Sequence, residues 1–279
     1  MQKTAYLDNN VVIDLIERKY PKDDAALDTF ASTRRLRWVL SPWHWVEAAR
    51  SGDETQAKET ANFLDSLGAL WLRERIALQK REIQAYLSGR PGDIALIDPI
   101  CKTVSEVASE LSERKGAAVI QSSSDLVTKL LRNPSALQKL DTAYQVNEEA
   151  FAENAKNFRA GRLTRESAWK RYMCGLAKAL DFSSDLARLR QAEPAAFRAI
   201  SAEFEVAMEH WRRAGKDAGM RMSAHRLGDV FHIVVALPYV DYFVSQDNRL
   251  MGLLKCVGRK LPFGKAERVG SPAELLKRL

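Results

Sequence analysis

The chain has 279 residues, of which 46% are hydrophobic and 28% charged, a composition typical of a globular protein with a sizeable core. No apolar run approaches the roughly 20 residues that a membrane-spanning helix requires, and the first residues lack the basic and apolar regions of a signal peptide. The three cysteines are widely spaced, which disfavours a disulfide framework and a zinc cluster and fits a reducing cytoplasm. The net charge of +7 permits a polyanionic partner such as RNA or DNA, although solubility alone also accounts for it.

The N-terminal segment is predicted to be a strand that runs directly into a helix. Residues 4–8 have the composition of a strand, and the helix that follows is expected to have Asn9 or Asn10 as its N-cap. Asp8 then lies at the carboxyl end of a strand and just before a helix, the usual place for a site in an open α/β sheet. The alternative for Asp8 is an ordinary turn residue. Asp14 is expected to hold the turn or to complement the positive end of the helix.

A second strand and helix are predicted over residues 34–50. The strand covers residues 34–41, and the helix has Ser41 as its N-cap and Pro42 at its first position. Glu47 lies about one turn into this helix, where an isolated glutamate is usually solvated, so a function for it depends on other acidic residues. Positive charge accompanies the strand, as a solvated edge or as a site for phosphate groups, on Arg34, Arg35 and Arg37.

Residues 51–221 are predicted to be mainly helical because apolar residues recur at three- and four-residue spacing. The segments that carry this spacing are residues 57–67, 82–87, 100–114, 126–131, 136–159, 166–180 and 195–214. An extended piece is expected only around residues 71–73. The block is too long for a structureless loop, so it is expected to be a helical subdomain inserted into an α/β core. Glu82, within it, is not expected to reach the acidic residues at the strand ends.

The segment from residue 222 to residue 250 is predicted to be a buried helix, a tight corner and a buried strand. Pro238 ends the helix because proline lacks an amide hydrogen, and residues 239–245 have the aromatic and β-branched composition of a core strand. Asp229 lies on the first turn of the helix and Asp247 just past the strand. A further helix over residues 250–257, a strand from Glu267 and a last helix capped by Ser271 complete an alternation that predicts an α/β fold with a parallel sheet.

Four acidic residues can then converge on one edge of the sheet: Asp8, Glu47, Asp229 and Asp247. Converging carboxylates repel one another, so they cannot all stay ionised without a cation. Oxygen ligands favour Mg²⁺ or Mn²⁺ over zinc, and such an ion can activate water and neutralise charge on a phosphodiester. Ser245 is placed to position a ligand or a water molecule. His232 is expected to be a core residue or to support a ligand.

The motifs around these acids are residues 6–14, Ser41 with Glu47, residues 228–236, residues 242–250 and residues 269–276. In their order they resemble the PIN-domain family, over about the first 50 and the last 58 residues. The resemblance implies a three-layer α/β/α core with a central parallel sheet, made of residues 1–50 and 222–279, with residues 51–221 as the helical insertion. It also implies a Mg²⁺- or Mn²⁺-dependent nuclease, usually a ribonuclease, whose acidic metal site is formed by Asp8, Glu47, Asp229 and Asp247.

The chain departs from the family pattern without losing any of the four carboxylates. Ser245 replaces the usual threonine beside the last acid, and Asn9 stands where many members have threonine or serine. Asp241 is an additional acid, expected to cap the strand start or to reach a neighbour. Supporting residues are expected to be Asn9, Ser245 and Asp14. Contacts with nucleic acid are expected from Arg34, Arg35, Arg226 and Arg249.

Two functions of different classes follow from this reading. The leading hypothesis is a cytoplasmic metal-dependent endoribonuclease of toxin–antitoxin or defence type, with RNA preferred to DNA. Its expected partners are nucleic acid, an antitoxin or other protein, and a second copy of the chain, but no membrane. The alternative is a module with the same fold that binds nucleic acid or protein without catalysis. A phosphatase with Asp8 as nucleophile is disfavoured because Asn10 stands where a second aspartate is needed.

Overall fold

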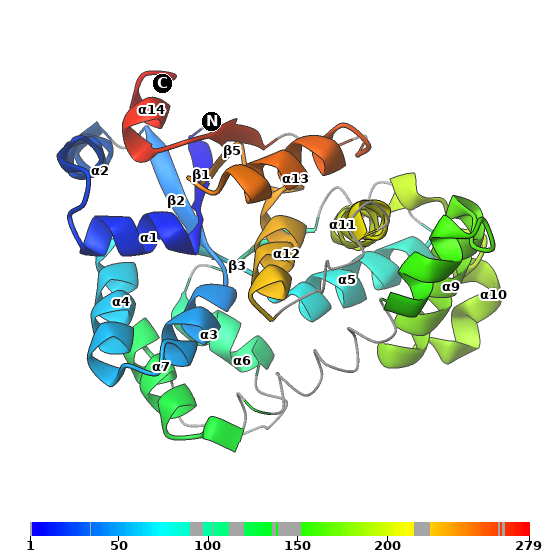
Figure 1. The fold of residues 1–279 in the computed structure, drawn as a ribbon. Coiled ribbons are helices and arrows are strands. Elements are labelled where there is room, and N and C mark those ends of the chain that lie inside the picture. Colours follow the sequence, from blue (N-terminus) through cyan, green and yellow to red (C-terminus); the bar gives the residue numbers. More distant parts are fainter. Residues whose placement is uncertain are drawn as a thin grey trace.

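The computed structural model describes residues 2–33, 35–89, 97–101, 103–111, 120–135, 138, 152–214, 224–261, 263 and 266–279; for residues 111, 214 and 224–229 it describes the backbone alone. At the centre lies a six-stranded sheet with the strand order β4-β3-β2-β1-β5-β6 (Figure 1). Its strands are β1 (Lys3–Leu7), β2 (Leu36–Leu40), β3 (Leu70–Leu72), β4 (Ile100–Cys101), β5 (Tyr242–Val244) and β6 (Glu267–Val269). The pairs between described strands are parallel except β3 with β4, which confirms the predicted α/β class.

The direction in which the sheet grows reverses between β1 and β5. From β1 the chain adds β2 and then β3 on one side, and much later it returns to the other side of β1 as β5 and β6. In open α/β sheets, ligands bind outside the carboxyl ends of the strands at such a reversal. The topology therefore directs attention to the residues that follow Leu7 and Val244.

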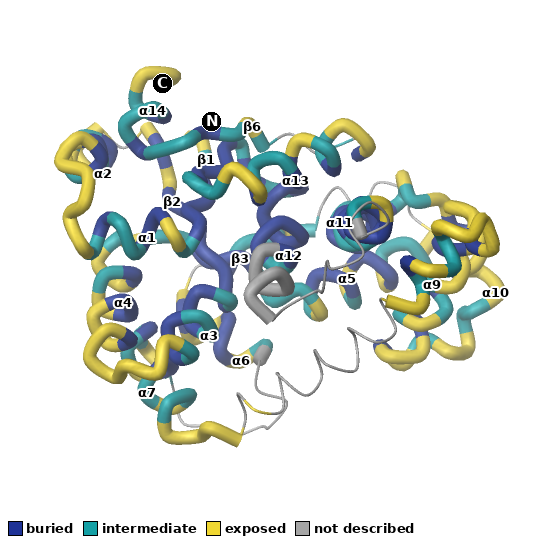
Figure 2. The backbone as a smooth tube through the Cα atoms, viewed as in Figure 1, coloured by how far each residue is buried: buried dark blue, intermediate teal, exposed yellow. Residues whose placement is uncertain are grey.

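Helices cover both faces of the sheet because strand side chains alternate between the faces. Ala5 and Leu7 of β1 face apolar residues of α1 (Asn9–Ile16), α2 (Pro21–Thr33), α3 (Trp43–Arg50), α4 (Glu54–Ser66), α6 (Val104–Leu111), α7 (Ser123–Leu131) and α14 (Pro272–Leu276). Tyr6 faces the opposite layer, formed by α5 (Arg75–Leu87), α11 (Ala199–Ala214), α12 (Ala224–Ala236) and α13 (Asn248–Gly258). The strands are mostly buried between the two helical layers (Figure 2).

A group of helices lies to one side of the sheet (Figure 1), and we call it the helical part. A third apolar cluster holds these helices together. It contains Trp169 and Met173 of α9 (Arg165–Ala179), Phe204 of α11 and Ile83 of α5. The opposite faces of α5 and α11 pack against the sheet, so these two helices join the helical part to the α/β core. The remaining elements are η2 (Ser183–Asp185), α10 (Leu186–Leu189) and η3 (Pro194–Ala196). No helix in the described ranges has the length and apolar character to cross a membrane.

The strands β3 and β4 correct the boundary expected at residue 51. Both lie within residues 51–221, yet both pair in the central sheet, and α4 and α7 of the same range pack on one of its faces. The helical part outside the core is therefore smaller than predicted. Runs of two or three strand residues are too short to reveal a period in the sequence, although the extended piece expected at residues 71–73 overlaps β3. Most of the helix predicted over residues 136–159 falls outside the described residues.

Two helix starts differ from the prediction, and one agrees. The N-cap of α1 is Asp8 rather than an asparagine, because its carboxylate accepts the N–H of Asn9. Helix α3 begins at Trp43 without a side-chain cap, so Ser41 is not its N-cap. The N-cap predicted for the last helix is confirmed, since the hydroxyl of Ser271 accepts the N–H of the third helical residue at 3.2 Å.

Candidate functional site

Asp8 lies at the point where the sheet reverses its growth. Its backbone N–H donates to the carbonyl of Val244 at 2.9 Å, which places it between the carboxyl ends of β1 and β5. Its side chain is buried: Oδ1 accepts the N–H of Asn9 at 2.9 Å and Oδ2 accepts the hydroxyl of Ser245 at 2.8 Å. The same hydroxyl oxygen accepts the N–H of Asp247 at 3.1 Å. Ser245 thus connects the carboxylate of Asp8 to the backbone of Asp247.

The pKa of Asp8 is raised from 3.8 to about 6. Burial is the main cause, and the negative charge of Glu47 adds to it, while the charge of His232 and the hydrogen bond from Ser245 act in the opposite direction. Loss of water penalises the ionised form of a carboxylate, and a second carboxylate nearby penalises it further. A cation between the two groups would remove this penalty.

Glu47 is positioned by a chain of hydrogen bonds that crosses three elements. His232 Nε2 lies 3.0 Å from Glu47 Oε2, and His232 Nδ1 is hydrogen-bonded to the hydroxyl of Tyr6. That hydroxyl lies 2.7 Å from Ser41 Oγ. Burial raises the pKa of Tyr6 well above 10, so its hydroxyl keeps its proton. Because the carboxylate of Glu47 only accepts, Nε2 of His232 carries a proton and donates it to Glu47.

The hydrogen bond from His232 also affects the ionisation of Glu47. Burial acts to raise the pKa of Glu47, but the charge and the hydrogen bond of His232 outweigh it and hold that pKa below its usual value. Asp8 and Glu47 therefore have opposite shifts, although both are carboxylates at the same edge. His232 is buried and bound to a predicted site residue, so it combines the two roles expected for it.

His44 is a structural residue beside this chain. It is fully buried, its Nε2 lies 2.8 Å from the carbonyl of Leu7 and its Nδ1 lies 3.1 Å from the backbone nitrogen of Ser41. A carbonyl only accepts, so the ring proton is on Nε2, and Nδ1 accepts from Ser41. Burial and the charge of His232 lower the pKa of His44 to about 4. The neutral ring thus ties the end of β1 to the turn before α3.

The remaining two acids are placed by α12 and α13. Asp247 is the N-cap of α13, and its Oδ1 accepts the N–H groups of Arg249 at 2.6 Å and Leu250 at 3.0 Å. Asp229 is the sixth residue of α12, in the second turn rather than the first, because the helix begins at Ala224. It precedes His232 by three residues, a spacing that shares one side of a helix; its side chain lies outside the described part of the chain.

Among the described residues, no group of three or more histidine, cysteine, aspartate and glutamate side chains has metal-binding geometry. This statement does not cover Asp229, because its side chain lies outside the described part of the chain. Within the described part, the structure brings Asp8 close enough to Glu47 for their charges to interact, and Ser245 connects Asp8 to the backbone of Asp247.

The supporting residues differ in how close they lie to the acids. Asn9 follows Asp8 directly, and its Oδ1 is buried without a hydrogen-bond donor among the described residues. Asp14 has neither of the two roles predicted for it, holding the turn or complementing the positive end of α1. It lies near the other end of the helix and binds Lys19 Nζ at 2.8 Å. Arg249 is exposed at the start of α13, at the same edge as Asp8.

Two of the other residues predicted to contact nucleic acid are not fully described. Arg34 lies outside the described residues, and the side chain of Arg226 does so as well. Arg35 is exposed just before β2, at the end of the sheet opposite to Asp8. At about 3.3 Å per strand residue, roughly 20 Å separates the two ends.

Asp241 and Glu82 have structural roles. Asp241 reaches a neighbouring strand, one of the two roles expected for it: it accepts the N–H of Thr4 in β1 at 2.9 Å and binds Lys3 Nζ at 3.0 Å. Glu82 is fully buried at the start of α11, where it accepts three backbone N–H groups and the hydroxyl of Tyr239 at 2.8 Å. Glu82 therefore joins α5 to α11, and its described bonds do not involve the acidic site, in agreement with the prediction.

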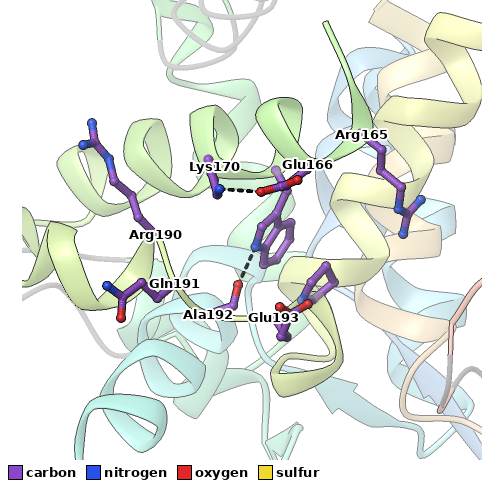
Figure 3. A pocket seen from close by; sticks show the side chains of 9 residues that line it. Arg165, Glu166, Lys170, Arg190, Gln191, Ala192 and Glu193 are labelled. Atoms are coloured by element: carbon purple, nitrogen blue, oxygen red, sulfur yellow. Dashed lines mark hydrogen bonds and ion pairs between the residues drawn. The ribbon is translucent and has the colours of Figure 1, made fainter.

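A pocket of ≈ 420 Å³ lies in the helical part and is lined by α9 and by the segment between α10 and η3 (Figure 3). Its charged side chains already bind groups of the protein: Lys170 Nζ pairs with Glu166 Oε1 at 2.5 Å, and Arg165 pairs with Glu205. Its aromatic member, Trp169, is buried.

Tyr6 and Ser41 belong to the sequence motifs around the acids, but a contact of either residue with the site was not predicted. The signal for Tyr6 is a tyrosine among the buried residues of a short strand, since a buried hydroxyl requires a partner. Comparisons with protein-family models, with curated proteins and with solved structures found no match to this chain.

Proposed function

We propose that this chain is a Mg²⁺- or Mn²⁺-dependent endoribonuclease with a PIN-like core, which hydrolyses phosphodiester bonds at the carboxyl edge of its sheet. The observation that carries the proposal is the buried carboxylate of Asp8, whose pKa is raised to about 6 at the reversal point of the sheet. A buried carboxylate with a perturbed pKa at such a position is a candidate for a functional group. The order of Asp8, Glu47, Asp229 and Asp247 along the chain, which resembles the PIN-domain family, supports the same assignment.

The donor groups fit a hard divalent cation. Asp8, Glu47 and Asp247 offer carboxylate oxygens, and Asn9 Oδ1 is a buried oxygen without a donor among the described residues. Asp229, three residues before His232 in the sequence of α12, would add a fourth acid. Oxygen-only donor sets favour Mg²⁺ or Mn²⁺. A bound ion would activate water and neutralise negative charge that develops on the phosphodiester.

The residues of the chain orient these oxygens. Ser245 donates to one oxygen of Asp8, and His232 donates to one oxygen of Glu47, so both carboxylates are held in fixed directions. A carboxylate has about four lone-pair directions, so the two hydrogen bonds accepted by Asp8 and the one accepted by Glu47 leave capacity for a cation. Arg249, exposed at the same edge, is placed to bind a phosphate of the substrate.

Cleavage of a panel of single-stranded RNA, double-stranded RNA and single-stranded DNA, with Mg²⁺, Mn²⁺ or EDTA, tests the proposal. We expect metal-dependent cleavage of RNA that Asp8→Asn and Glu47→Gln abolish. Ser245→Ala is expected to lower it by about 10- to 100-fold, the effect of removing a residue that orients a ligand. Asp28→Asn and Glu59→Gln remove exposed carboxylates of the same types from α2 and α4 and are expected to cleave like the wild type.

The absence of cleavage with any nucleic acid and metal, together with the absence of metal binding in calorimetry, would refute the proposal. Nucleic-acid binding without cleavage and without metal binding would favour the non-catalytic module instead. Cleavage that persists in Asp8→Asn would show that the reaction occurs elsewhere on the protein.

A further inference from the structure

Two aromatic side chains meet beside the acidic site, one from α3 and one from α12. The rings of Trp43 and Phe231 contact edge to face, with centroids 4.7 Å apart and planes at 66°. The guanidinium of Arg50 lies over the Trp43 ring at 5.2 Å, and that of Arg75 lies over the Phe231 ring at 4.7 Å. All four side chains are partly exposed. We call this group of residues the aromatic–arginine stack.

The stack differs from the aromatic packing of the interior. Trp45, two residues after Trp43, stacks face to face on Trp71 with centroids 4.2 Å apart, and both of these rings are buried. That pair fills the core under α3. The pair formed by Trp43 and Phe231 keeps part of its surface in contact with solvent, although large aromatic side chains gain most from complete burial. Part of this second pair therefore remains accessible to a ligand.

The stack lies at the rim of the acidic site. Trp43 precedes Glu47 by four residues in α3, a spacing that places both on the same side of the helix. Phe231 directly precedes His232, whose Nε2 lies 3.0 Å from Glu47 Oε2. A chain segment bound at the acids would thus pass within one helical turn of the aromatic rings.

Each arginine of the stack interacts with a neighbouring acid. Arg75 pairs with Glu203 at 2.5 Å, and Glu203 also accepts a hydrogen bond from Gln79. This anchors the guanidinium that covers Phe231. Arg50 is the last residue of α3, and its positive charge acts to lower the pKa of Glu47.

Two partly exposed rings in contact, each with a guanidinium group over it, match the requirements of one class of ligand. Unpaired bases stack on aromatic rings and on guanidinium planes, and the adjacent positive charges attract the phosphate groups between them. In a duplex, the neighbouring bases already occupy both faces of each base. We infer that the aromatic–arginine stack binds an unpaired base of a single-stranded nucleic acid next to the bond that is cut, an inference that rests on the proposed nuclease function.

Equilibrium binding in EDTA tests this inference without any cleavage. Fluorescence anisotropy of a short fluorescein-labelled single-stranded RNA gives the Kd for the wild type, Trp43→Leu and Trp43→Phe. Stacking of one base contributes about 1–3 kcal/mol, so Trp43→Leu is expected to raise the Kd by about 5- to 150-fold. Trp43→Phe keeps an aromatic face and should restore most of the affinity. The matched control is Tyr20→Leu, since Tyr20 is exposed and lies under Lys19 at 5.3 Å but is remote from the acids.

A set of RNAs that each lack one base separates direct stacking from a structural role of Trp43. With the wild type, one abasic position is expected to weaken binding as much as Trp43→Leu does. With Trp43→Leu, the same abasic RNA should bind no more weakly than the intact RNA, because the two changes remove one contact. Circular dichroism with thermal melting checks that both Trp43 variants are folded.

The inference would be overturned by an unchanged Kd in folded Trp43→Leu, by equal affinity for the matching duplex, or by failure of the wild type to bind any single strand. It would also be overturned if no abasic position reproduced the effect of the substitution. Tight, Trp43-dependent binding without cleavage under any metal would leave the stack established and would refute the nuclease proposal alone. Metal-dependent cleavage by the wild type, together with an affinity that does not depend on Trp43, would support the nuclease proposal and refute the role of the stack.

Discussion

Replacement of Asp8 by asparagine is expected to stabilise the metal-free protein at neutral and alkaline pH. The folded protein buries this carboxylate next to the charge of Glu47, which raises its pKa from 3.8 to about 6. The folded state therefore binds a proton more tightly than the unfolded state does. Because of this difference, the free energy of unfolding falls as the pH rises from about 4 to about 6 and stays low above that range.

The magnitude follows from the size of the shift. One pKa unit corresponds to 1.36 kcal/mol, so a shift of about two units costs the ionised wild type about 3 kcal/mol. An asparagine at this position keeps an oxygen for the N–H of Asn9, and its amide can donate to the hydroxyl of Ser245. The hydrogen bonds of the neutral amide are weaker than those of the carboxylate, which reduces the gain from the substitution by about 1 kcal/mol. The net stabilisation expected for Asp8→Asn is about 2 kcal/mol.

Urea unfolding in EDTA, at about pH 8 and at about pH 4, measures this difference. Asp8→Asn is expected to be the more stable protein at the higher pH and to lose its advantage at the lower pH, where the wild-type carboxyl is protonated. Asp28→Asn, which changes an exposed aspartate of α2, should match the wild type at both. The reasoning would be refuted by an Asp8→Asn protein that is less stable at about pH 8, or by a difference that does not change with pH.

Two further outcomes follow from the same contacts. Mn²⁺ at about 100 times its Kd should add about 2.7 kcal/mol to the wild type, measured as a rise in Tm. That rise should be lost in Asp8→Asn and Glu47→Gln and kept in Glu59→Gln; an equal rise in all variants would contradict a metal site at these acids. Glu82→Ala should lower the free energy of unfolding by about 3 kcal/mol, because it leaves three buried N–H groups at the start of α11 and the Tyr239 hydroxyl without their acceptor. Urea unfolding measures this loss, and a change below about 1 kcal/mol would show that water replaces the carboxylate.

The sequence by itself determined the elements of the core and the positions of its acids along them. The alternation of strands and helices, the end of α12 before Pro238 and the cap of α14 at Ser271 all depend on neighbouring residues, so local patterns predicted them. The same is true of Asp8, which follows a strand and precedes a helix. Local patterns gave only the approximate position of β3 and missed β4, because two strand residues are too few to show a period in the sequence.

Only the tertiary structure decided which side chains act together. Tyr6 meets His232 across 226 positions of the chain, and His232 meets Glu47 across 185. Glu82 belongs to the start of α11 rather than to the acids, and Asp241 holds the start of β1 rather than a ligand. A buried polar group requires a partner, but its own sequence neighbourhood does not specify which one. The partner is set by the crossing of distant strands and helices, and here that crossing gives Asp8 its raised pKa and Glu47 its lowered one.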